Sequence, residues 1–196
     1  MVEHIFSTKF NDHVLNDEVF NRIKDAAHKL HADVNQFYDE MPYGYHLDMA
    51  VDFLLRFMPQ PISDKVKYEL IFGMYFHDSI EDARQTYNDV KKIAKEILPE
   101  CDATRCAELV YALTNEKGRT RKEREGELYF AGMQHVDFAP LLKICDRMAN
   151  VEQSYLNKSR MLDVYRKEHE EFMRCIGTRD MTNQMVEMFN KFLKEE

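Results

Sequence analysis

The sequence Phe76-His77-Asp78-Ser79-Ile80-Glu81-Asp82 ends an apolar stretch that begins at Tyr68. Five of its seven side chains can bind a metal or move a proton. In a continuous helix, residues three and four apart share a face, so His77, Asp78 and Glu81 would converge. Two carboxylates and an imidazole at one buried helix end repel each other unless a cation or a proton lies among them. Because imidazole and carboxylate suit Mn, Fe and Zn, this segment predicts a divalent metal site on a helix.

The composition predicts a single all-α domain. The chain has 196 residues, of which 44% are hydrophobic and 12% aromatic, and this is enough for one sizeable core. Only 6 Gly and 5 Pro are present, too few for a loop-rich β fold. Because we find no repeat or interdomain linker, we expect one helical bundle over residues 1–196. Its core would span about 16–176, and 177–196 would form a C-terminal packing helix.

The charge balance limits the classes of partner. Lys plus Arg number 27 against 35 Asp plus Glu, which gives a net charge of −8. A nonspecific nucleic-acid binder needs a basic face, so we expect no nucleic-acid polymer as partner. A small phosphorylated ligand stays compatible, because a bound metal and nearby cationic side chains reverse the local sign. The oligomeric state stays open at this level.

The cysteines and the apolar runs indicate a soluble cytoplasmic protein. Cys101, Cys106, Cys145 and Cys175 form no CxxC pair, which is typical of reduced intracellular proteins. The N-terminal sequence has no apolar region typical of a signal peptide, and no apolar run is long enough to span a membrane. We therefore expect no membrane partner.

The first half of the chain reads as helices separated by short breaks. We expect an irregular arm over residues 1–15 and a helix capped by Asn16 or Asp17, with His28 and His31 near its end as surface or core residues. Residues 37–45 read as a loop broken by Pro42 and Gly44. His46 follows on the inward face of the next helix, where an imidazole is either a hydrogen-bonded core group or a ligand.

The next helices follow from capping signals. Ser63 or Asp64 would cap a helix that carries the inward stripe on to His77 and breaks after Asp82. Thr86 has the spacing of a capping box and would start a helix that stops before Pro99. A further helix is expected over Ala103–Thr114.

Residues 115–127 are densely charged and hold the strongest cationic group of the chain, which includes Arg121. One interpretation is a solvated loop with a helical start. The other is a clamp or lid for a substrate that carries phosphates.

The helix that follows Phe138 combines an apolar face with a polar stripe of Lys143, Asp146, Asn150 and Gln153. A narrow polar stripe beside a wide apolar one predicts a pocket-lining helix, whereas the simpler alternative is a solvent-facing edge. Two outer packing helices complete the chain. Ser159 would cap the first, which ends near Gly177, and the second would run from Met181 to Leu193.

Three motifs in this order resemble the HD-domain metal-dependent phosphohydrolase superfamily. Pro42-Tyr43-x-x-His46 is similar to a Pro-Tyr-x-x-His segment of alarmone hydrolases of the RelA/SpoT type. The segment from His77 to Asp82 is similar to their His-Asp-x-x-Glu-Asp. Lys143-Ile144-Cys145-Asp146-Arg147 with Asn150 is similar to their Lys-Leu-Ala-Asp-Arg-x-x-Asn. The resemblance extends from about residue 20 to about 175 and is closest to the small stand-alone hydrolases, because the synthetase and regulatory domains are absent.

The resemblance implies a buried mononuclear metal site and a hydrolytic enzyme. His46, His77, Asp78 and Asp146 would hold one divalent ion, Mn²⁺ in most relatives, with another divalent metal as the alternative. Glu81 and Asp82 would be the acid/base pair, and Glu81 is the better base because it lies three or four residues from two ligands. The substrate-binding candidates are Phe37, Tyr38, Tyr43, Arg121, Lys143, Arg147, Asn150 and Gln153.

The expected reaction is removal of a phosphate or pyrophosphate from a phosphorylated nucleotide, with the 3′-pyrophosphate of (p)ppGpp as the first substrate. Alarmone hydrolases usually carry a basic pair where this chain has Phe37 and Tyr38, followed by Asp39 and Glu40. Aromatic rings can stack on a base, so this departure keeps nucleotide binding. Gln153 stands where many relatives have a small hydroxyl residue.

Other substrates and two other classes of protein stay open. A 2′-phosphorylated dinucleotide or a nucleoside triphosphate would use the same metal chemistry. A catalytically silent nucleotide sensor would keep the fold without turnover. A structural helical domain would use the same histidines and aspartates as core groups, and its stability would not depend on metal.

Overall fold

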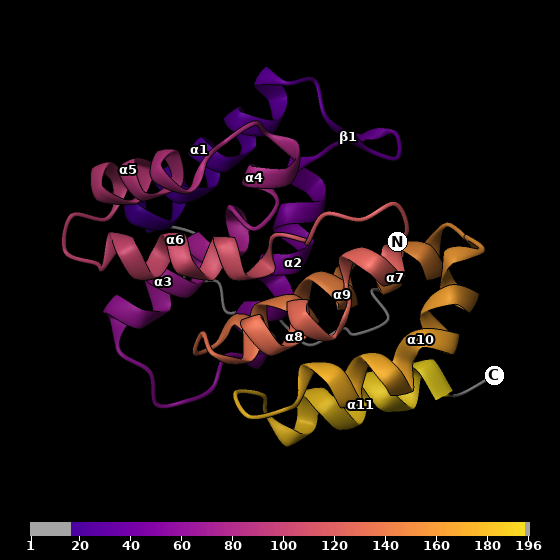
Figure 1. The fold of residues 1–196 in the computed structure, drawn as a ribbon. Coiled ribbons are helices and arrows are strands. Elements are labelled where there is room, and N and C mark those ends of the chain that lie inside the picture. The colour runs from indigo at the N-terminus through magenta and orange to yellow at the C-terminus, as the bar shows by residue number, and fades with distance from the viewer. Residues whose placement is uncertain (1–16, 195–196) are drawn as a thin grey trace.

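The computed structural model describes residues 17–194, and this part of the chain is mostly helical (Figure 1). The expected all-α class is confirmed, whereas the expected arm over 1–15 and the Asn16 cap lie outside the described residues. In order, the elements are α1 (Glu18–Asp33), β1 (Phe37–Tyr38), β2 (Met41–Pro42), α2 (Gly44–Phe57), α3 (Asp64–Tyr75), α4 (Ser79–Asp82), α5 (Tyr87–Ile97), α6 (Ala103–Leu113), α7 (Arg121–Arg124), α8 (Glu127–Gln134), α9 (Ala139–Leu156), α10 (Met161–Ile176) and α11 (Asn183–Lys194).

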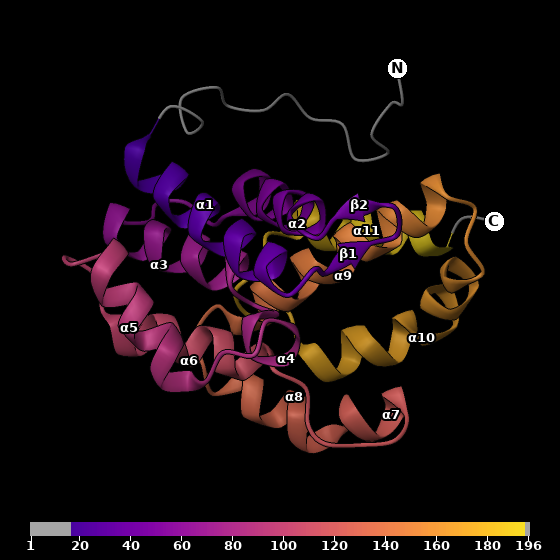
Figure 2. The ribbon, with the colours of Figure 1, turned by 90° about the horizontal axis from the view of Figure 1, so that it is seen from above.

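Helices α2 and α9 pack against each other in the middle of the molecule (Figures 1 and 2). On one side α3 packs on both of them, α6 packs on α3, and α5 covers α6. On the other side α10 packs against α8, α9 and α11. The side chains between α2, α3 and α9 are therefore buried, with α6 and α5 packed outside them on one side and α10 on the other.

The helix starts agree with the sequence signals. Asp17 Oδ1 accepts a hydrogen bond from Val19 N at 2.9 Å, and Ser63 Oγ accepts one from Val66 N. Thr86 and Asp89 form the expected capping box at the start of α5. Such caps satisfy backbone N–H groups that have no partner within the helix.

The expectation of one helix that continues through Asp82 is wrong. Helix α3 ends at Tyr75, the next three residues form a turn, and the single-turn α4 begins at Ser79. Asp78 has φ −98° and ψ 4°, outside the helical region. Successive residues of a helix point about 100° apart, so a continuous helix could not aim His77 and Asp78 at one centre. The turn brings both side chains to the same point.

Three further expectations need correction. Residues 37–42, expected as loop, form a two-stranded antiparallel hairpin in which Tyr38 pairs with Met41, and Asp39 takes a left-handed φ of 54° at its tip. The charged segment 115–127 contains the short helix α7, and α8 begins at its last residue. The final helix begins at Asn183, so Met181 precedes it.

Three of the four residues of the polar stripe on α9 are buried and Asn150 is half-buried, whereas a pocket lined by this stripe stays a prediction. Lys143 and Asp146 are each 8% exposed and Gln153 is 9% exposed. The solvent-edge alternative is therefore wrong for these three residues. Within residues 17–194, no helix combines the length and the apolar character needed to cross a bilayer.

Candidate metal centre

The four predicted ligands come from three separate elements and meet in the interior. His46 lies in the first turn of α2, His77 and Asp78 lie in the turn between α3 and α4, and Asp146 lies in the middle of α9. His46 and His77 are 1% and 2% exposed. The packing of α2 against α3 and α9 brings these elements together.

The ligand atoms face one another at short distances. His46, His77 and Asp78 each offer one nitrogen or oxygen, and these three atoms lie within 4.8 Å of one another. His77 Nε2 lies 2.8 Å from Asp78 Oδ2, and the two Nε2 atoms lie 3.3 Å apart. Asp146 Oδ1 lies 3.3 Å from His46 Nε2 and 3.6 Å from His77 Nε2. Two nitrogens and two carboxylates thus surround one point.

A backbone contact fixes the orientation of the His77 ring. His77 Nδ1 lies 2.8 Å from the carbonyl oxygen of Met74, which can only accept, so Nδ1 carries the proton and donates. In the neutral ring Nε2 then presents its lone pair to the cluster. Metal-binding histidines are usually oriented by such a contact of their other nitrogen.

The Asp146 carboxylate is held on both oxygens. Lys143 Nζ lies 3.2 Å from Oδ2, and Asn150 Nδ2 donates to Oδ1 at 2.7 Å. Lys143 and Asn150, predicted to bind substrate, therefore contact a candidate ligand. Lys143 Nζ also lies 3.7 Å from Glu125 Oε1. These contacts keep Asp146 aimed at the two histidines.

The electrostatics of the cluster favour positive charge at its centre. Burial alone would lower the pKa of His77, but Asp78 and Asp146 raise that pKa well above its ordinary value. Burial alone would raise the pKa of Asp78, whereas the nearby His77 lowers it to about 2. Against the same effect of burial, Lys143 and the two histidines hold the pKa of Asp146 well below its ordinary value. The carboxylates thus stay ionised and attract a cation.

Glu81 and Asp82 lie on α4 next to the cluster and stay open to solvent on one side. Glu81 accepts hydrogen bonds from the backbone N of Asn115 at 2.6 Å and from its side-chain Nδ2 at 3.1 Å. Asp82 Oδ2 accepts one from Gln36 Nε2 at 2.8 Å. Partial burial raises the pKa of both carboxyls, and Asp78 adds to this. Both carboxyls therefore hold a proton more readily than a fully solvated carboxyl does.

The hairpin covers the cluster with two tyrosines. Tyr38 donates to Asn150 Oδ1 at 2.9 Å, and its ring centroid lies 4.7 Å from that of His46. Tyr43, just after the hairpin, donates to Asp78 Oδ2. Phe37 stays 63% exposed on β1, so its ring is available to a ligand.

Three other predicted substrate-binding residues contact the protein itself. Gln153 Nε2 donates to Asp39 Oδ2 at 3.0 Å and so ties α9 to the hairpin. Arg147 pairs with Glu168 at 2.9 Å, and the guanidinium lies over the rings of Tyr165 and Phe172 on α10. Arg121 of α7 lies 3.4 Å from Glu125 and 3.5 Å from Glu168. Lys143, Glu125, Arg121 and Glu168 thus form a chain of ion pairs from Asp146 to α10.

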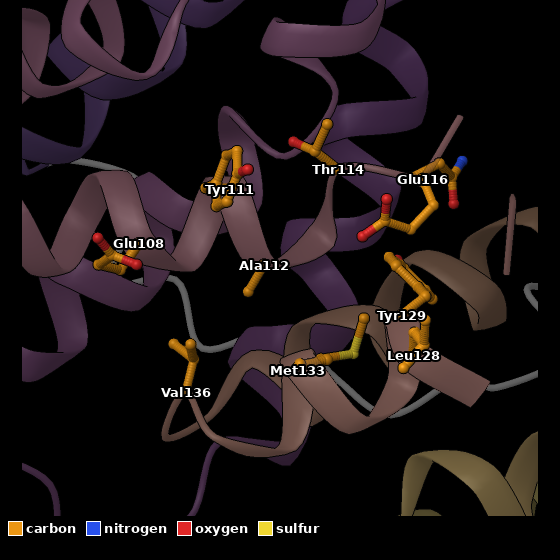
Figure 3. Close-up of a pocket in the computed structure, with 11 residues that line it drawn as sticks. Glu108, Tyr111, Ala112, Thr114, Glu116, Leu128, Tyr129, Met133 and Val136 are labelled. Atoms are coloured by element: carbon orange, nitrogen blue, oxygen red, sulfur yellow. The ribbon is translucent and has the colours of Figure 1, made fainter. Parts of the chain in front are cut away.

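A separate cavity of about 260 Å³ lies between α6 and α8 (Figure 3). Tyr111 and Thr114 border it from the α6 side, and Leu128 and Met133 border it from α8. Asn115, which holds Glu81, is part of its wall. None of the residues predicted as ligands, acid/base groups or substrate contacts lines this cavity.

The sequence did not indicate three of the contacts that shape the site. Met74 contacts His77 through its backbone carbonyl oxygen, and no pattern of side chains in the sequence predicts this contact. Asn115 and Gln36 are single amides in loops, 34 and 46 residues away from the carboxylates that they hold. Only the fold brings such groups together.

Comparison of the chain with protein-family models, with curated proteins and with solved structures gave no match.

Proposed function

We propose that this protein is a metal-dependent phosphohydrolase of the HD-domain type that acts on a phosphorylated nucleotide. The observation that carries the proposal is the meeting of His46, His77, Asp78 and Asp146 at one buried point, with both Nε2 atoms within 4 Å of both carboxylates. Glu81 and Asp82 beside that point add two carboxyls with raised pKa values.

The donor set fits a divalent transition metal. Two imidazoles and two carboxylates suit Mn²⁺, Fe²⁺ or Zn²⁺, and the Met74 contact leaves His77 Nε2 free to bind. His46, His77, Asp78 and Asp146 would hold the ion. When bound, such an ion supplies Lewis-acid catalysis and an activated water near neutral pH.

The proton transfers are assigned to the two carboxyls on α4. Glu81 would take the proton of the attacking water, since Asn115 holds its carboxylate in one orientation beside Asp78. Asp82 would position that water or give a proton to the leaving oxygen. Lys143 would keep Asp146 ionised throughout, because its ammonium group lies against that carboxylate.

For the substrate we propose a purine nucleotide with a ribose-linked phosphate or pyrophosphate, with ppGpp tested first. The exposed ring of Phe37 would stack on the base. Arg121 would turn from Glu125 and Glu168 to a phosphate, since a charge-assisted pair with phosphate can replace one with carboxylate. The segment that carries α7 would then act as the lid.

The test is a release assay for phosphate and pyrophosphate. Protein stripped of metal and reloaded with Mn²⁺ is offered ppGpp, a 2′-phosphorylated dinucleotide and nucleoside triphosphates. Release that is lost in His77→Ala and kept in His135→Ala, an exposed histidine at the end of α8, is the expected result. Absence of release from every nucleotide, with the metal retained, would replace the proposal with a nucleotide sensor.

A further inference from the structure

Besides their contacts with α9 and the loop after α6, the carboxylates of the site are joined by hydrogen bonds to the end of α1. His31 lies in the last turn of α1 and is only 1% exposed, although the sequence indicated no role for it in the site. His31 Nδ1 is hydrogen-bonded to Gln36 Oε1, and Gln36 Nε2 donates to Asp82 Oδ2 at 2.8 Å. One glutamine thus joins a buried histidine to a candidate acid/base group.

The backbone of Gln36 is fixed as well as its side chain. Its N–H donates to the carbonyl oxygen of His31 at 3.0 Å, and its own carbonyl oxygen accepts from Tyr43 N at 3.3 Å. All four polar groups of Gln36 therefore have partners, and three of them connect it to His31 or Asp82. A side chain held in this way has little freedom to rotate.

The same histidine supports a second carboxylate of the site. The His31 ring stacks on Tyr43, with centroids 4.6 Å apart and planes 21° apart, and Tyr43 donates to Asp78 Oδ2. The end of α1 thus holds Asp82 through Gln36 and holds Asp78 through Tyr43. These are the two carboxylates at either end of α4.

The direction of the hydrogen bonds follows from the chemistry of the groups. An ionised carboxylate only accepts, so the NH₂ end of Gln36 must face Asp82. The amide oxygen then faces His31, and His31 must carry its proton on Nδ1. His31 Nε2 is left with no hydrogen-bond partner among the described residues. Hydrogen bonds in the reverse direction, with the Gln36 oxygen facing Asp82, would need a proton on Asp82.

We propose that Gln36, oriented by His31, is a positioning residue that holds the carboxylate of Asp82 in its working orientation. The proposal rests on the hydrolase function proposed above. The amide occupies Oδ2 and leaves Oδ1 of Asp82 to face water or the leaving group. Because Asp82 is open to solvent on one side, its carboxylate would otherwise rotate freely.

The kinetic test compares Gln36→Leu with the wild type on the nucleotide that the wild type hydrolyses. We expect kcat to fall about tenfold, with KM and bound metal unchanged, since one hydrogen bond to a charged group is lost. Gln134→Leu is the matched control. Gln134 is the last residue of α8 and its Nε2 donates to the carbonyl oxygen of Cys175, so kcat should stay at the wild-type value. An unchanged kcat in Gln36→Leu, or an equal loss in Gln134→Leu, would overturn the proposal.

A second measurement does not depend on activity. Nitrogen NMR of the histidine rings should show His31 as the Nδ1–H tautomer at neutral pH, and this preference should disappear in Gln36→Leu. An Nε2–H tautomer in the wild type would mean that the Gln36 amide donates to His31 instead of to Asp82, and this would overturn the proposal. If the wild type hydrolyses nothing, the proposed function fails, while the ring tautomer still decides whether Gln36 donates to Asp82.

Discussion

The Nε2 atoms of His46 and His77 lie 3.3 Å apart, and Asp146 Oδ1 lies 3.3 and 3.6 Å from them. Because Nδ1 of His77 already donates to Met74, the neutral His77 ring presents a lone pair to its neighbour. That lone pair lies among two ionised carboxylates and a second imidazole, an arrangement that is unfavourable unless a proton or a cation lies among the four groups. A divalent cation meets this requirement for all four groups at once.

The first prediction concerns the dependence of stability on metal. Mn²⁺ at a hundred times its dissociation constant should stabilise the folded protein by about 2.7 kcal/mol, since the unfolded chain has no such site. For a chain of this size the midpoint of thermal unfolding should rise by about 5–10 °C. Asp146→Ala should abolish the shift, measured by calorimetry with and without Mn²⁺.

The control for that prediction is Asp163→Asn on α10. Its carboxylate is 69% exposed and lies 3.8 Å from Arg166 on the same helix, so the shift with Mn²⁺ should stay. If Asp146→Ala keeps the full shift, the ion binds elsewhere. If the wild type shows no shift, the histidines and aspartates are core groups of a structural domain.

Much of the fold could be predicted because helical spacing and capping are local. The caps at Asp17, Ser63 and Thr86 depend only on neighbouring residues, and the stripes along α9 follow from the period of the helix. The break of α3 after Tyr75 could not be predicted in the same way. Its apolar pattern continues through Phe76, and the turn follows from the need to aim two adjacent side chains at ligands on other helices.

The site divides along the same line. The sequence predicted the four residues that meet at the centre, but not the contacts of Lys143, Asn150 and Gln153 with Asp146 and Asp39. The type of a side chain indicates a candidate ligand, whereas its partner depends on tertiary packing. The substrate-binding roles of these three residues, of Phe37 and of Arg121 stay predictions.

The second prediction is a pair of glycine substitutions with opposite effects. Gly73 lies where α3 packs on α6 and α9, and a Cβ there would lie 3.0 Å from Leu142 Cδ1 and 3.1 Å from Leu109 Cβ. Overpacking costs about 1–3 kcal/mol, more than the gain of about 1 kcal/mol from helix propensity, so Gly73→Ala should lower the free energy of unfolding.

The matched control for Gly73 is Gly132 on α8, where an added Cβ meets nothing within 4 Å. Gly132→Ala should raise the free energy of unfolding by about 0.5–1 kcal/mol in urea titrations. Stabilisation by both substitutions would show that α3, α6 and α9 pack more loosely than the structure has them.

The third prediction concerns how the hairpin is held over the cluster. Asp39 Oδ2 accepts from Gln153 Nε2 at 3.0 Å and from Asn157 Nδ2 at 2.7 Å. Asp39→Gly keeps the left-handed backbone but loses both hydrogen bonds. The free energy needed to open the hairpin away from α9 should therefore fall by about 1 kcal/mol. Hydrogen exchange of residues 36–43 should then be about fivefold faster. Asp39→Asn keeps an acceptor oxygen and should stay near the wild type; equal exchange in all three proteins would contradict the prediction.

The last prediction concerns acid stability where α11 packs on α10. His169 is 3% exposed and its Nε2 bonds Asn190 Oδ1 at 2.7 Å; burial lowers its pKa below 6.5. The unfolded state therefore binds more protons than the folded state just below pH 6.5. The contribution of the neutral His169 to the free energy of unfolding is complete above that pH and is lost as the pH falls. His169→Gln should make the free energy of unfolding, measured by urea titration, depend less on pH in this range. Asn190→Asp should favour the imidazolium, raise the His169 pKa and reverse the slope; an unchanged slope in both variants would remove His169 as the source.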